Sequence, residues 1–348
     1  MTHKPPKPTP AAASEPEPLP VPELPPRVIL DLATKCNLRC AMCPVWGSDD
    51  EDAIEAAKGI MALENAKKVL DEVMAAKPLI HPALYGEPTL APSFKAVVRD
   101  VKARGLTVAI NTNGLTLHPE MAEFLVEIGL DSISISIDAV TPETLMKIRG
   151  IDKLAKIETG VANMLRARGD RTVPRIGVSF TTQEQNKHEE AAFIEKWTPI
   201  VDVVRIGHVF LDGYFQDIKA PEKRVPCNAL YLTMPVHNDG SVTVCCLDGF
   251  KETNMGNVFE TSVKEVWLGE KFQEVRRWHE TDQYDKIPIC QKCNGWVQYL
   301  FEDEVRDGLL IRRSPEFVYY NRIDRLSNWS GQLLGGHPEP ALEDTDGN

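Results

Sequence analysis

Apolar and polar positions alternate with two different periods between residues 27 and 209. Short apolar runs rich in β-branched residues predict strands, and the amphipathic stretches between them predict helices. The expected strands are 27–33, 78–86, 106–112, 132–138, 175–182 and 201–209. The expected helices are 63–76, 92–104, 118–128, 142–167 with a break near Gly150, and 187–197. Parallel neighbours need a long connection, so these repeats predict an α/β fold with a parallel sheet and helical crossovers.

The pattern changes after about residue 215, where short strand-like runs are joined by Asn, Asp and Gly turns and followed by a helix that ends in VRRWHE. This predicts a first domain over 27–215 and a smaller unit over 216–300. Proline is so frequent in residues 1–26 that neither helix nor strand can persist, which predicts a disordered leader. Residues 301–348 are expected to form a C-terminal helix and an acidic tail.

A formal net charge of -12 leaves no basic stripe for a phosphate backbone, so we expect no nucleic acid partner. No apolar run is long enough for a membrane span, and the N-terminus lacks the apolar core of a signal peptide. We therefore expect a cytoplasmic protein with no membrane partner. In a reducing cytosol, clustered thiols are more often metal ligands or reactive groups than disulfides.

The eight cysteines fall in two sets, and the first set, Cys36, Cys40 and Cys43, follows the first expected strand as C-x3-C-x2-C. Three thiols are too few for a closed structural zinc site. A cubane 4Fe-4S cluster held by three thiolates instead leaves one iron open to a small molecule. In parallel α/β folds sites gather at the carboxyl ends of strands, so YGEP, NTNG and SIDA, which end the next three strands, are expected at the same rim.

The string CNLRCAMCP resembles the radical S-adenosylmethionine (SAM) superfamily, and especially its SPASM/twitch branch. It departs from the family at Met42, where an aromatic ring is frequent, although methionine can also pack against an adenine. The resemblance implies a partial (β/α)6 TIM-like barrel, with a 4Fe-4S cluster on the three cysteines and SAM chelating the open iron. Three unrelated thiols, or part of a zinc knuckle, are the alternative.

Two further segments resemble the SAM contacts of the superfamily. YGEPTL is similar to its GGEP segment, with Tyr85 in place of the first glycine, and the resemblance implies that backbone around Gly86, Glu87 and Pro88 receives the methionine ammonium. SISISIDA is similar to the ribose-contact strand, where the two-residue period puts Ser136 and Asp138 on one face. The alternative for the second segment is a polar strand end followed by a helix cap at Thr141.

Asn113 in NTNG and Arg149 in KIRG complete the predicted SAM site. Asn113 resembles a third-strand residue that contacts cofactor or substrate, although a turn alone would explain Asn-Gly. Arg149 stands where related enzymes often have an arginine near the SAM carboxylate. An exposed helical arginine is the alternative there.

The second cysteine set reads C-x12-G-x4-C from Cys227 to Cys245 and ends with the C-x2-C pair Cys290 and Cys293. It resembles the opening of a SPASM domain. A full SPASM domain continues with further cysteines, and none follows Cys293, so the resemblance is to the shortened twitch form with one auxiliary 4Fe-4S cluster. Four thiolates in two pairs could also bind zinc. With the flanking MGNVFETSVKEVW, the likeness covers about residues 27–300.

Cys246 is left over from this set. Adjacent residues on a strand point to opposite faces, so we do not expect Cys245 and Cys246 to ligate one iron together. Cys246 is then either a buried apolar residue or a catalytic hydrogen donor, as in some radical SAM epimerases.

The resemblance implies an enzyme that cleaves SAM reductively, with electrons from a flavodoxin- or ferredoxin-type partner, and abstracts hydrogen from a small-molecule substrate. We expect an oxidoreductase that turns an alcohol into a ketone with the auxiliary cluster as electron acceptor, similar to the 2-deoxy-scyllo-inosamine dehydrogenase group of twitch enzymes. A radical epimerase, a peptide-modifying SPASM/twitch enzyme and a non-catalytic iron-sulfur or zinc electron carrier are the alternatives.

The leader is too short for the separate domain that peptide-modifying members commonly carry, which favours a small sugar or cyclitol-like substrate. Hydrophilic candidates for its pocket are Tyr85, His208, Asp212, Tyr214 and His237.

Overall fold

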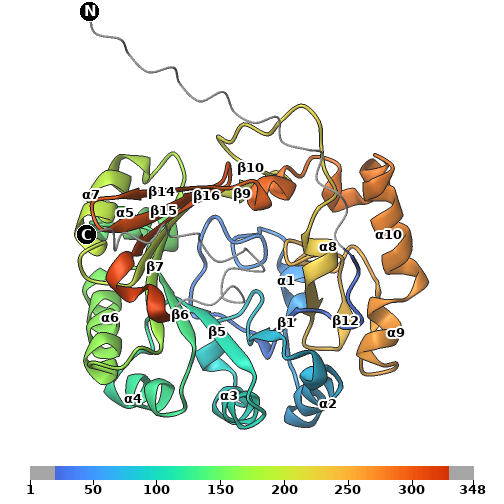
Figure 1. Cartoon of the computed structure of the whole chain (residues 1–348), viewed down its shortest axis with the longest axis horizontal. Coiled ribbons are helices and arrows are strands. Elements are labelled where there is room, and N and C mark those ends of the chain that lie inside the picture. The colour runs from blue at the N-terminus through green and yellow to red at the C-terminus, as the bar shows by residue number, and fades with distance from the viewer. Residues whose placement is uncertain (1–19, 329–348) are drawn as a thin grey trace, which may run out of the picture.

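A twelve-stranded sheet organises the computed structural model, which describes residues 20–328. All six predicted strands form, and they lie side by side in chain order and parallel to one another (Figure 1). They are β1 (Arg27–Leu30), β4 (Leu79–His81), β5 (Thr107–Thr112), β6 (Ser132–Ser136), β7 (Arg175–Thr182) and β8 (Val203–His208). The first predicted run is divided, because β2 (Ala33–Thr34) leaves the sheet to pair with β3 (Gly59–Ile60).

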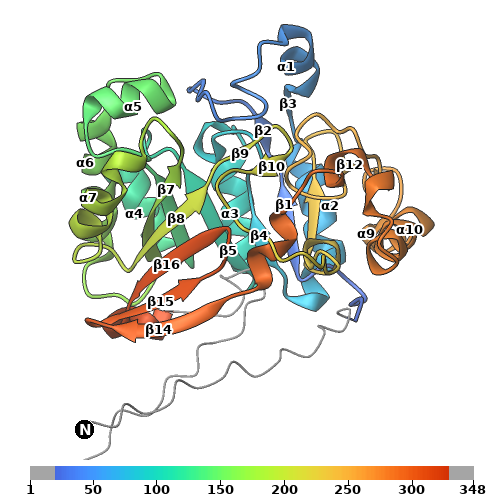
Figure 2. The same cartoon turned by 90° about the horizontal axis from the view of Figure 1, so that it is seen from above.

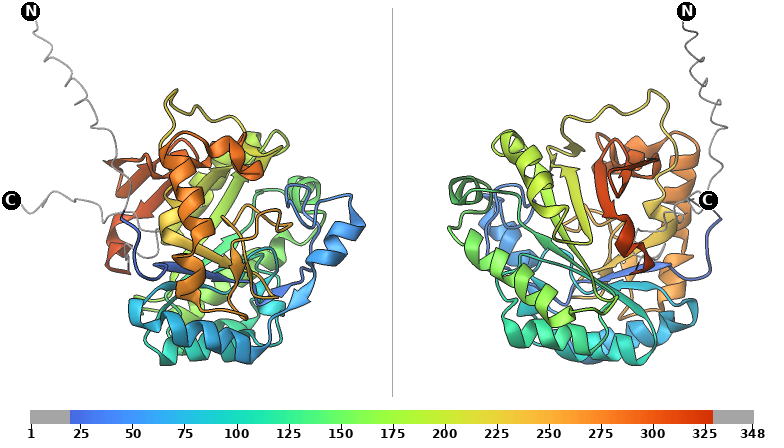
Figure 3. Two further views of the ribbon diagram at one scale, coloured as in Figure 1. Left: turned by 90° about the vertical axis from the view of Figure 1, so that its right-hand side faces the viewer. Right: turned by 60° about the vertical axis from the view of Figure 1, so that its left-hand side comes forward.

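The predicted helices lie along the outer side of this sheet (Figure 3). They are α2 (Leu63–Val73) with η1 (Met74–Ala76), α3 (Phe94–Ala103), α4 (Pro119–Glu127), α5 (Pro142–Arg149), α6 (Leu154–Arg168) and α7 (Glu190–Trp197) preceded by η3 (Lys187–Glu189). Gly150 ends α5 with a left-handed φ of 70°, which glycine adopts without steric cost, so the expected break is confirmed.

The two faces of the sheet differ in chemistry, as β6 shows. Ile133 and Ile135 are buried in the core beneath the helices, whereas Ser132, Ser134 and Ser136 are half-buried on the opposite face. The strand register aligns those serines with further polar or small residues, namely Asn111, Gly177, Ser179 and Arg205. A closed (β/α)8 barrel fills its interior with bulky branched side chains. Here the chain forms a mixed α/β fold with a partial TIM-like barrel whose inner face is polar.

The C-terminal region extends this sheet on the β1 side. Strand β11 (Thr233–Val236) runs parallel to β1, and β12 (Ser241–Val242) and β13 (Gly256–Asn257) follow as antiparallel neighbours. The helices of this region are α8 (Ala229–Leu232), α9 (Val263–Trp267) and α10 (Glu270–Glu280), the last being the predicted VRRWHE helix. Three short 3-10 turns close it: η4 (Tyr284–Lys286), η5 (Pro288–Cys290) and η6 (Gly295–Tyr299).

Residues 302–322, within the segment predicted to hold a C-terminal helix, form strands. The chain forms β14 (Glu302–Arg306), β15 (Leu309–Arg313) and β16 (Phe317–Arg322), and β16 pairs antiparallel with β8 (Figure 2). Aromatic and aliphatic residues in LLIRR and FVYYNR favour strands, and Gly308, with φ of 74°, permits the tight turn between the first two. A 3-10 helix, η7 (Ile323–Asn328), ends the described chain, and the predicted acidic tail beyond it lies outside the described residues.

The end of the predicted leader contacts the folded chain. The Pro22 carbonyl accepts a hydrogen bond of 2.9 Å from Trp267 Nε1, and the Pro26 carbonyl accepts one of 2.9 Å from the Leu79 amide. These contacts anchor residues 22–26 to α9 and β4, while residues 1–19 lie outside the described range. Within residues 20–328, no helix combines the length and apolar character needed to cross a membrane.

Three short elements near the rim carry no sequence prediction. Helix α1 (Glu51–Ala57) lies in the acidic segment after the first cysteines and is capped by Asp50, which accepts from the Ala53 amide at 2.9 Å. The hairpin of β9 (Phe210–Leu211) and β10 (Tyr214–Phe215) follows β8, and η2 (Pro88–Leu90) follows β4.

Candidate functional site

The first cysteine loop follows β2 at the carboxyl end of β1. It folds on itself, because the Cys43 amide donates to the Cys40 carbonyl at 2.9 Å and the Trp46 amide donates to the Cys43 sulfur at 3.3 Å. Gly47 closes the loop, since a Cβ there would lie 2.5 Å from the Cys40 carbonyl oxygen. Burial raises the pKa of Cys40 to about 11, with nearby Arg149 opposing the rise. Metal binding at this thiol must therefore displace a proton.

The YGEP segment abuts this loop. A Cβ on Gly86 would lie 1.8 Å from the Ala33 carbonyl oxygen, so only glycine fits, and the Glu87 amide donates to the Lys35 carbonyl at 2.8 Å. The buried Glu87 carboxylate accepts from Thr112 Oγ1 at 2.7 Å and from the Asn113 amide at 2.8 Å. The Glu87 side chain thus fastens the end of β4 to the end of β5. Only the backbone of the segment is available for a methionine ammonium.

Asn113 is buried and joins the third strand end to the cysteine loop. Its Nδ2 donates to Asn37 Oδ1 at 2.7 Å, and its Oδ1 accepts from the Leu115 amide at 3.1 Å. The second bond is the turn that the Asn-Gly alternative predicts. The first bond places Asn113 beside the residue that follows Cys36.

Asp138 does not share a face with Ser136, contrary to the prediction. Strand β6 ends at Ser136, and Asp138 has a left-handed φ of 65° and is fully buried. One carboxylate oxygen accepts from Arg149 Nε at 2.9 Å and the other from the Thr181 amide at 2.8 Å. The carboxylate therefore holds Arg149 instead of facing a ribose. Ser136 lies half-buried on the inner face, with its hydroxyl 3.3 Å from that of Ser179.

Arg149 is buried, so its alternative as an exposed helical residue is wrong. Its guanidinium forms an ion pair with Asp138 at the end of α5, and its charge acts on Cys40 and Cys36. The predicted cap at Thr141 also forms, since its hydroxyl accepts from the Thr144 amide. A fixed positive charge beside the first cysteine loop suits a carboxylate ligand there.

The second cysteine set gathers around one apolar cluster, in which Cys227, Cys245 and Cys290 pack with residues such as Leu230 and Val244. Burial raises the pKa of Cys227 and of Cys290 to about 12, and Cys293 adds to both shifts. The four predicted ligands thus lie near one another, with Cys290 buried and the other three half-buried. Their mutual repulsion as thiolates would be relieved by a cationic metal centre.

Cys245 and Cys246 lie in a turn, because β12 ends at Val242. The prediction that they face opposite sides of a strand assumed a strand at these residues, and the structure has none there. Cys246 is exposed, so its interpretation as a buried apolar residue is wrong.

Neither cysteine set is arranged around a single ion. Among residues 20–328, no three His, Cys, Asp or Glu side chains lie close enough together to hold one metal. Zinc needs its donors around one centre, whereas a cubane binds each thiolate through a different iron. The all-sulfur donor sets fit iron-sulfur clusters, which are held by cysteine thiolates.

Comparison with known families agrees with this chemistry. The profile described as "Radical SAM superfamily" matches residues 31–190, and the SPASM profile, described as "Iron-sulfur cluster-binding domain", matches residues 227–294. The chain contains a radical SAM domain followed by a SPASM domain. It is a radical SAM enzyme with a SPASM/twitch-type domain, and its cofactors are SAM and iron-sulfur clusters.

Similar proteins cover different chemistries. A "Tungsten-containing aldehyde ferredoxin oxidoreductase cofactor-modifying protein" from Pyrococcus furiosus is 25% identical over 76% of this chain and 86% of its own length. A "Probable GTP 3',8-cyclase" from Saccharolobus islandicus is 29% identical over 48% of this chain, which spans 51% of that cyclase. The crystal structure of BtrN with AdoMet and 2-DOIA shares the fold, with a TM-score of 0.54 and 17% identity. The match covers 78% of this chain and 93% of the BtrN chain.

Tyr85 connects the two cysteine sets of this radical SAM enzyme. Its hydroxyl donates to the Cys246 carbonyl at 2.6 Å, and its own carbonyl accepts from Trp46 Nε1 at 2.7 Å. Gly249 packs on its ring, where a Cβ would come within 2.9 Å. The residue that replaces a family glycine therefore links the SAM-side loop to the auxiliary loop.

Two residues that the sequence did not single out, Arg205 and Glu316, form an ion pair of 3.5 Å at the rim. Strand β16 runs antiparallel to β8 and pairs Phe317 with Gly207, which brings Glu316 to the carboxyl end of β8. Gly207 leaves room for the guanidinium, since a Cβ would lie 2.5 Å from Arg205 Nη1. Burial raises the pKa of Glu316 to about 7, and Arg205 opposes this rise. No motif marks Glu316, because only the β8–β16 pairing places it there.

The other residues predicted to line the substrate pocket lie in different parts of the structure. His237 is buried and its Nε2 lies 3.1 Å from Thr243 Oγ1, so it is a structural residue. His208 is half-buried at the end of β8, and Tyr214 is exposed on the β9–β10 hairpin. Asp212 lines a cavity of about 350 Å³ between the first cysteine loop and the auxiliary segments, whose lining also includes Pro44, Asp248, Phe250, Pro288 and Lys292.

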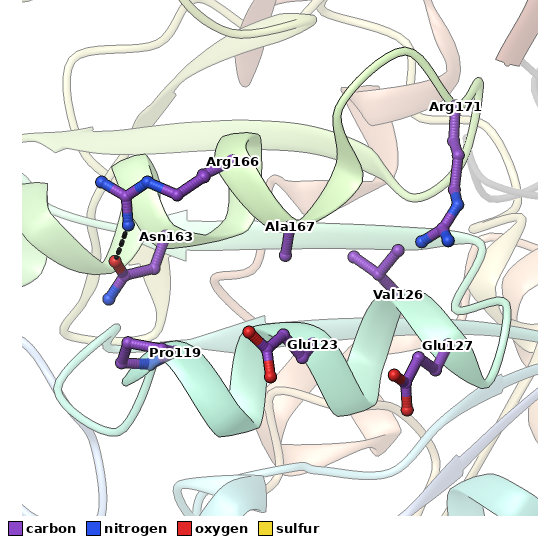
Figure 4. A pocket seen from close by; sticks show the side chains of 8 residues that line it. All are labelled: Pro119, Glu123, Val126, Glu127, Asn163, Arg166, Ala167 and Arg171. Carbon is purple, nitrogen blue, oxygen red and sulfur yellow. Dashed lines mark hydrogen bonds between the residues drawn. The ribbon is translucent and has the colours of Figure 1, made fainter.

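A second cavity of about 350 Å³ lies between α4 and α6 on the outer helical layer (Figure 4). Arg166 and Asn163 are hydrogen-bonded at 2.9 Å on one of its walls, and Glu123 and Glu127 lie on the other. None of the predicted site residues lines it. It therefore has no part in the chemistry proposed below.

Proposed function

We propose that this enzyme oxidises an alcohol of a small polar substrate, such as a sugar or cyclitol, and passes the released electron to an auxiliary 4Fe-4S cluster. The observation that carries this proposal is the linkage of the two cysteine sets through Tyr85 at the rim of a barrel with a polar inner face. An electron acceptor beside the substrate space suits an oxidation. A reductant of the flavodoxin or ferredoxin type would supply the electron for SAM cleavage.

The proposed ligands follow from the two loops. Cys36, Cys40 and Cys43 would hold the SAM-binding cluster, and Cys227, Cys245, Cys290 and Cys293 would hold the auxiliary one. When bound, SAM and its cluster supply the radical that removes a hydrogen atom from a C-H bond. The protein contributes the backbone at Gly86 and Pro88, the amide of Asn113, the hydroxyl of Ser136 and the charge of Arg149 to position SAM.

The inner face of the barrel supplies polar contacts for substrate hydroxyls. Asn111 is exposed, and Ser134 and Arg205 are half-buried on that face. Hydroxyl, amide and guanidinium groups both donate to and orient polyols. An apolar substrate would leave these groups without partners, which costs binding free energy.

Glu316 is the proposed acceptor of the hydroxyl proton. Conversion of an alcohol to a ketone removes one hydrogen atom from carbon, one proton from oxygen and one electron. A carboxylate with a pKa near 7 takes up and releases a proton readily at neutral pH. Arg205, 3.5 Å away, holds the carboxylate at the rim and orients it.

The relatives support two variants of this reaction. BtrN was crystallised with 2-DOIA, which supports a small ligand in this fold. The cofactor-modifying relative aligns along most of its length, which supports modification of a small cofactor precursor as a second candidate. The exposed thiol of Cys246 favours a third, epimerisation with Cys246 as hydrogen donor.

One experiment separates these reactions. The anaerobically reconstituted enzyme is incubated with SAM, a reductant and a panel of polyols, aminocyclitols and GTP in deuterated water, and the products are weighed. Oxidation yields 5'-deoxyadenosine and a product that has lost two hydrogens. A product of the same mass apart from one added deuterium supports epimerisation and contradicts our proposal. Replacing Cys246 by alanine should stop epimerisation but leave oxidation largely intact.

A further inference from the structure

Arg224 lies in the segment between β10 and α8, three residues before Cys227. Its Nη1 donates to the carbonyl of Cys290 at 3.1 Å and to that of Cys293 at 3.0 Å. Its guanidinium also lies 3.7 Å from the centre of the Tyr284 ring. One arginine thus fixes both ends of the C-x2-C turn, and the aromatic ring holds the arginine in place.

The guanidinium is not fully satisfied by the protein. Its Nε is buried and has no hydrogen-bond acceptor among residues 20–328. No carboxylate within that range forms an ion pair with Arg224. Arginine keeps its positive charge even when buried, so this group retains both an unpaired donor and an unbalanced charge. Such a combination points to an anionic acceptor that the side chains do not provide.

The charge of Arg224 acts on the second cysteine set. Its guanidinium lies against the C-x2-C turn, within hydrogen-bond distance of the carbonyls of Cys290 and Cys293. A positive charge that stabilises these thiolates also stabilises any more negative state of a cluster bound to them.

We propose that Arg224 is the counter-charge of the auxiliary cluster and raises its reduction potential, so that it accepts an electron more readily. This rests on the proposed function, in which the second cysteine set holds a 4Fe-4S cluster. The potentials of such clusters depend on net charge, on hydrogen bonds and on solvent exposure. Arg224 contributes a charge and a buried, unpaired donor beside the C-x2-C turn.

The test compares variants of the full-length reconstituted protein in a redox titration followed by electron paramagnetic resonance. The signal of the first cluster is identified by its change upon addition of SAM. R224M and R224Q remove the charge. At a fixed potential, we expect them to lower the reduced-to-oxidised ratio of the auxiliary cluster about tenfold. This change corresponds to a reduction potential that is about 59 mV lower for a one-electron couple. R224K keeps the charge and should shift the ratio less.

R277M is the matched control, because Arg277 is an exposed arginine on the neighbouring α10. It should leave the potential unchanged. An iron content near eight per chain with no shift in R224M or R224Q overturns this inference but leaves the proposed function standing, whereas a wild-type content near four overturns both. Loss of the second cluster from both uncharged variants, with retention in R224K, supports the counter-charge, and loss from all three overturns it in favour of a packing role.

Discussion

At the scale of single residues, several carboxyl groups have contacts that differ from those implied by their sequence motif. The motif resemblance places Glu87 and Asp138 at SAM. In the structure, however, the Glu87 carboxylate accepts hydrogen bonds from the end of β5, and the Asp138 carboxylate accepts from Arg149. Conversely, Glu316 belongs to no motif, yet it lies buried at the rim and burial raises its pKa to about 7. Each of these roles follows from hydrogen-bond partners, which a motif does not specify.

Glu316 gives a pH-dependent prediction that needs no substrate. Burial raises its pKa from 4.5 to about 7, so the folded state binds the proton more tightly than the unfolded state. Its contribution to stability is fully present below pH 4.5 and is lost as the pH rises through 7, with an upper limit of about 3 kcal/mol. E316Q should lack this loss. Thermal unfolding midpoints of both proteins at pH 5 and pH 8 give the difference.

The outcome also bears on catalysis. If Glu316 accepts the substrate proton, wild-type turnover should fall below pH 7, where the carboxyl is protonated. E316Q should be slow at every pH while SAM still binds. An E316Q variant with the wild-type pH profile would contradict the role, and Arg205, Tyr319, Cys246 and Cys293 would be the other charged or titratable groups to examine.

At the scale of elements, the strands of the barrel have one apolar and one polar face, and the helices cover only the apolar one. This explains why all six strands and the covering helices were predictable from periodicity. The C-terminal hairpin was not, because its alternation is interrupted by arginines and its stability depends on pairing with β8. Short strands of this kind take their conformation from a partner that is far away in sequence.

A pair of substitutions on β6 tests the two-face description. Ile133 is 1% exposed and packs under the helices, so I133A should lower the free energy of unfolding by about 2–5 kcal/mol. S134A, one position further and on the inner face, should change it by less than about 0.5 kcal/mol. Urea titrations of the two variants under anaerobic conditions measure both values. Equal destabilisation would mean that the inner face is packed as tightly as the outer one.

At the scale of the whole molecule, the two iron-sulfur regions belong to one continuous sheet. Strand β11 of the C-terminal region pairs with β1, and β16 pairs with β8, so the C-terminal chain reaches both edges of the barrel. The two cysteine loops are consequently fixed at the same rim, joined by Tyr85. In the proposed reaction, one substrate would lie between the two redox centres.

Removing one cluster at a time tests this division of labour. C40A should leave about four irons per chain instead of about eight and abolish SAM cleavage, because one open iron is needed for SAM. C290A should leave a similar iron content but retain SAM cleavage to 5'-deoxyadenosine without substrate oxidation. Iron analysis together with chromatography of the nucleosides measures both. SAM cleavage by C40A would show that the cysteine loops have been assigned the wrong way round.

The sequence by itself determined the parallel α/β fold, the family and the two cysteine sets, since these depend on local periodicity and on short spacings along the chain. Only the tertiary structure decided that the C-terminal hairpin forms strands and that Asp138 forms an ion pair with Arg149. It also decided that Glu316 lies beside Arg205 at the rim and that Arg224 lies beside the second cysteine set. Those features arise from pairing between segments 66 or more residues apart, as in the β8–β16 register of Gly207 with Phe317, or from competition among buried hydrogen-bond partners. Local sequence patterns carry no record of such partners.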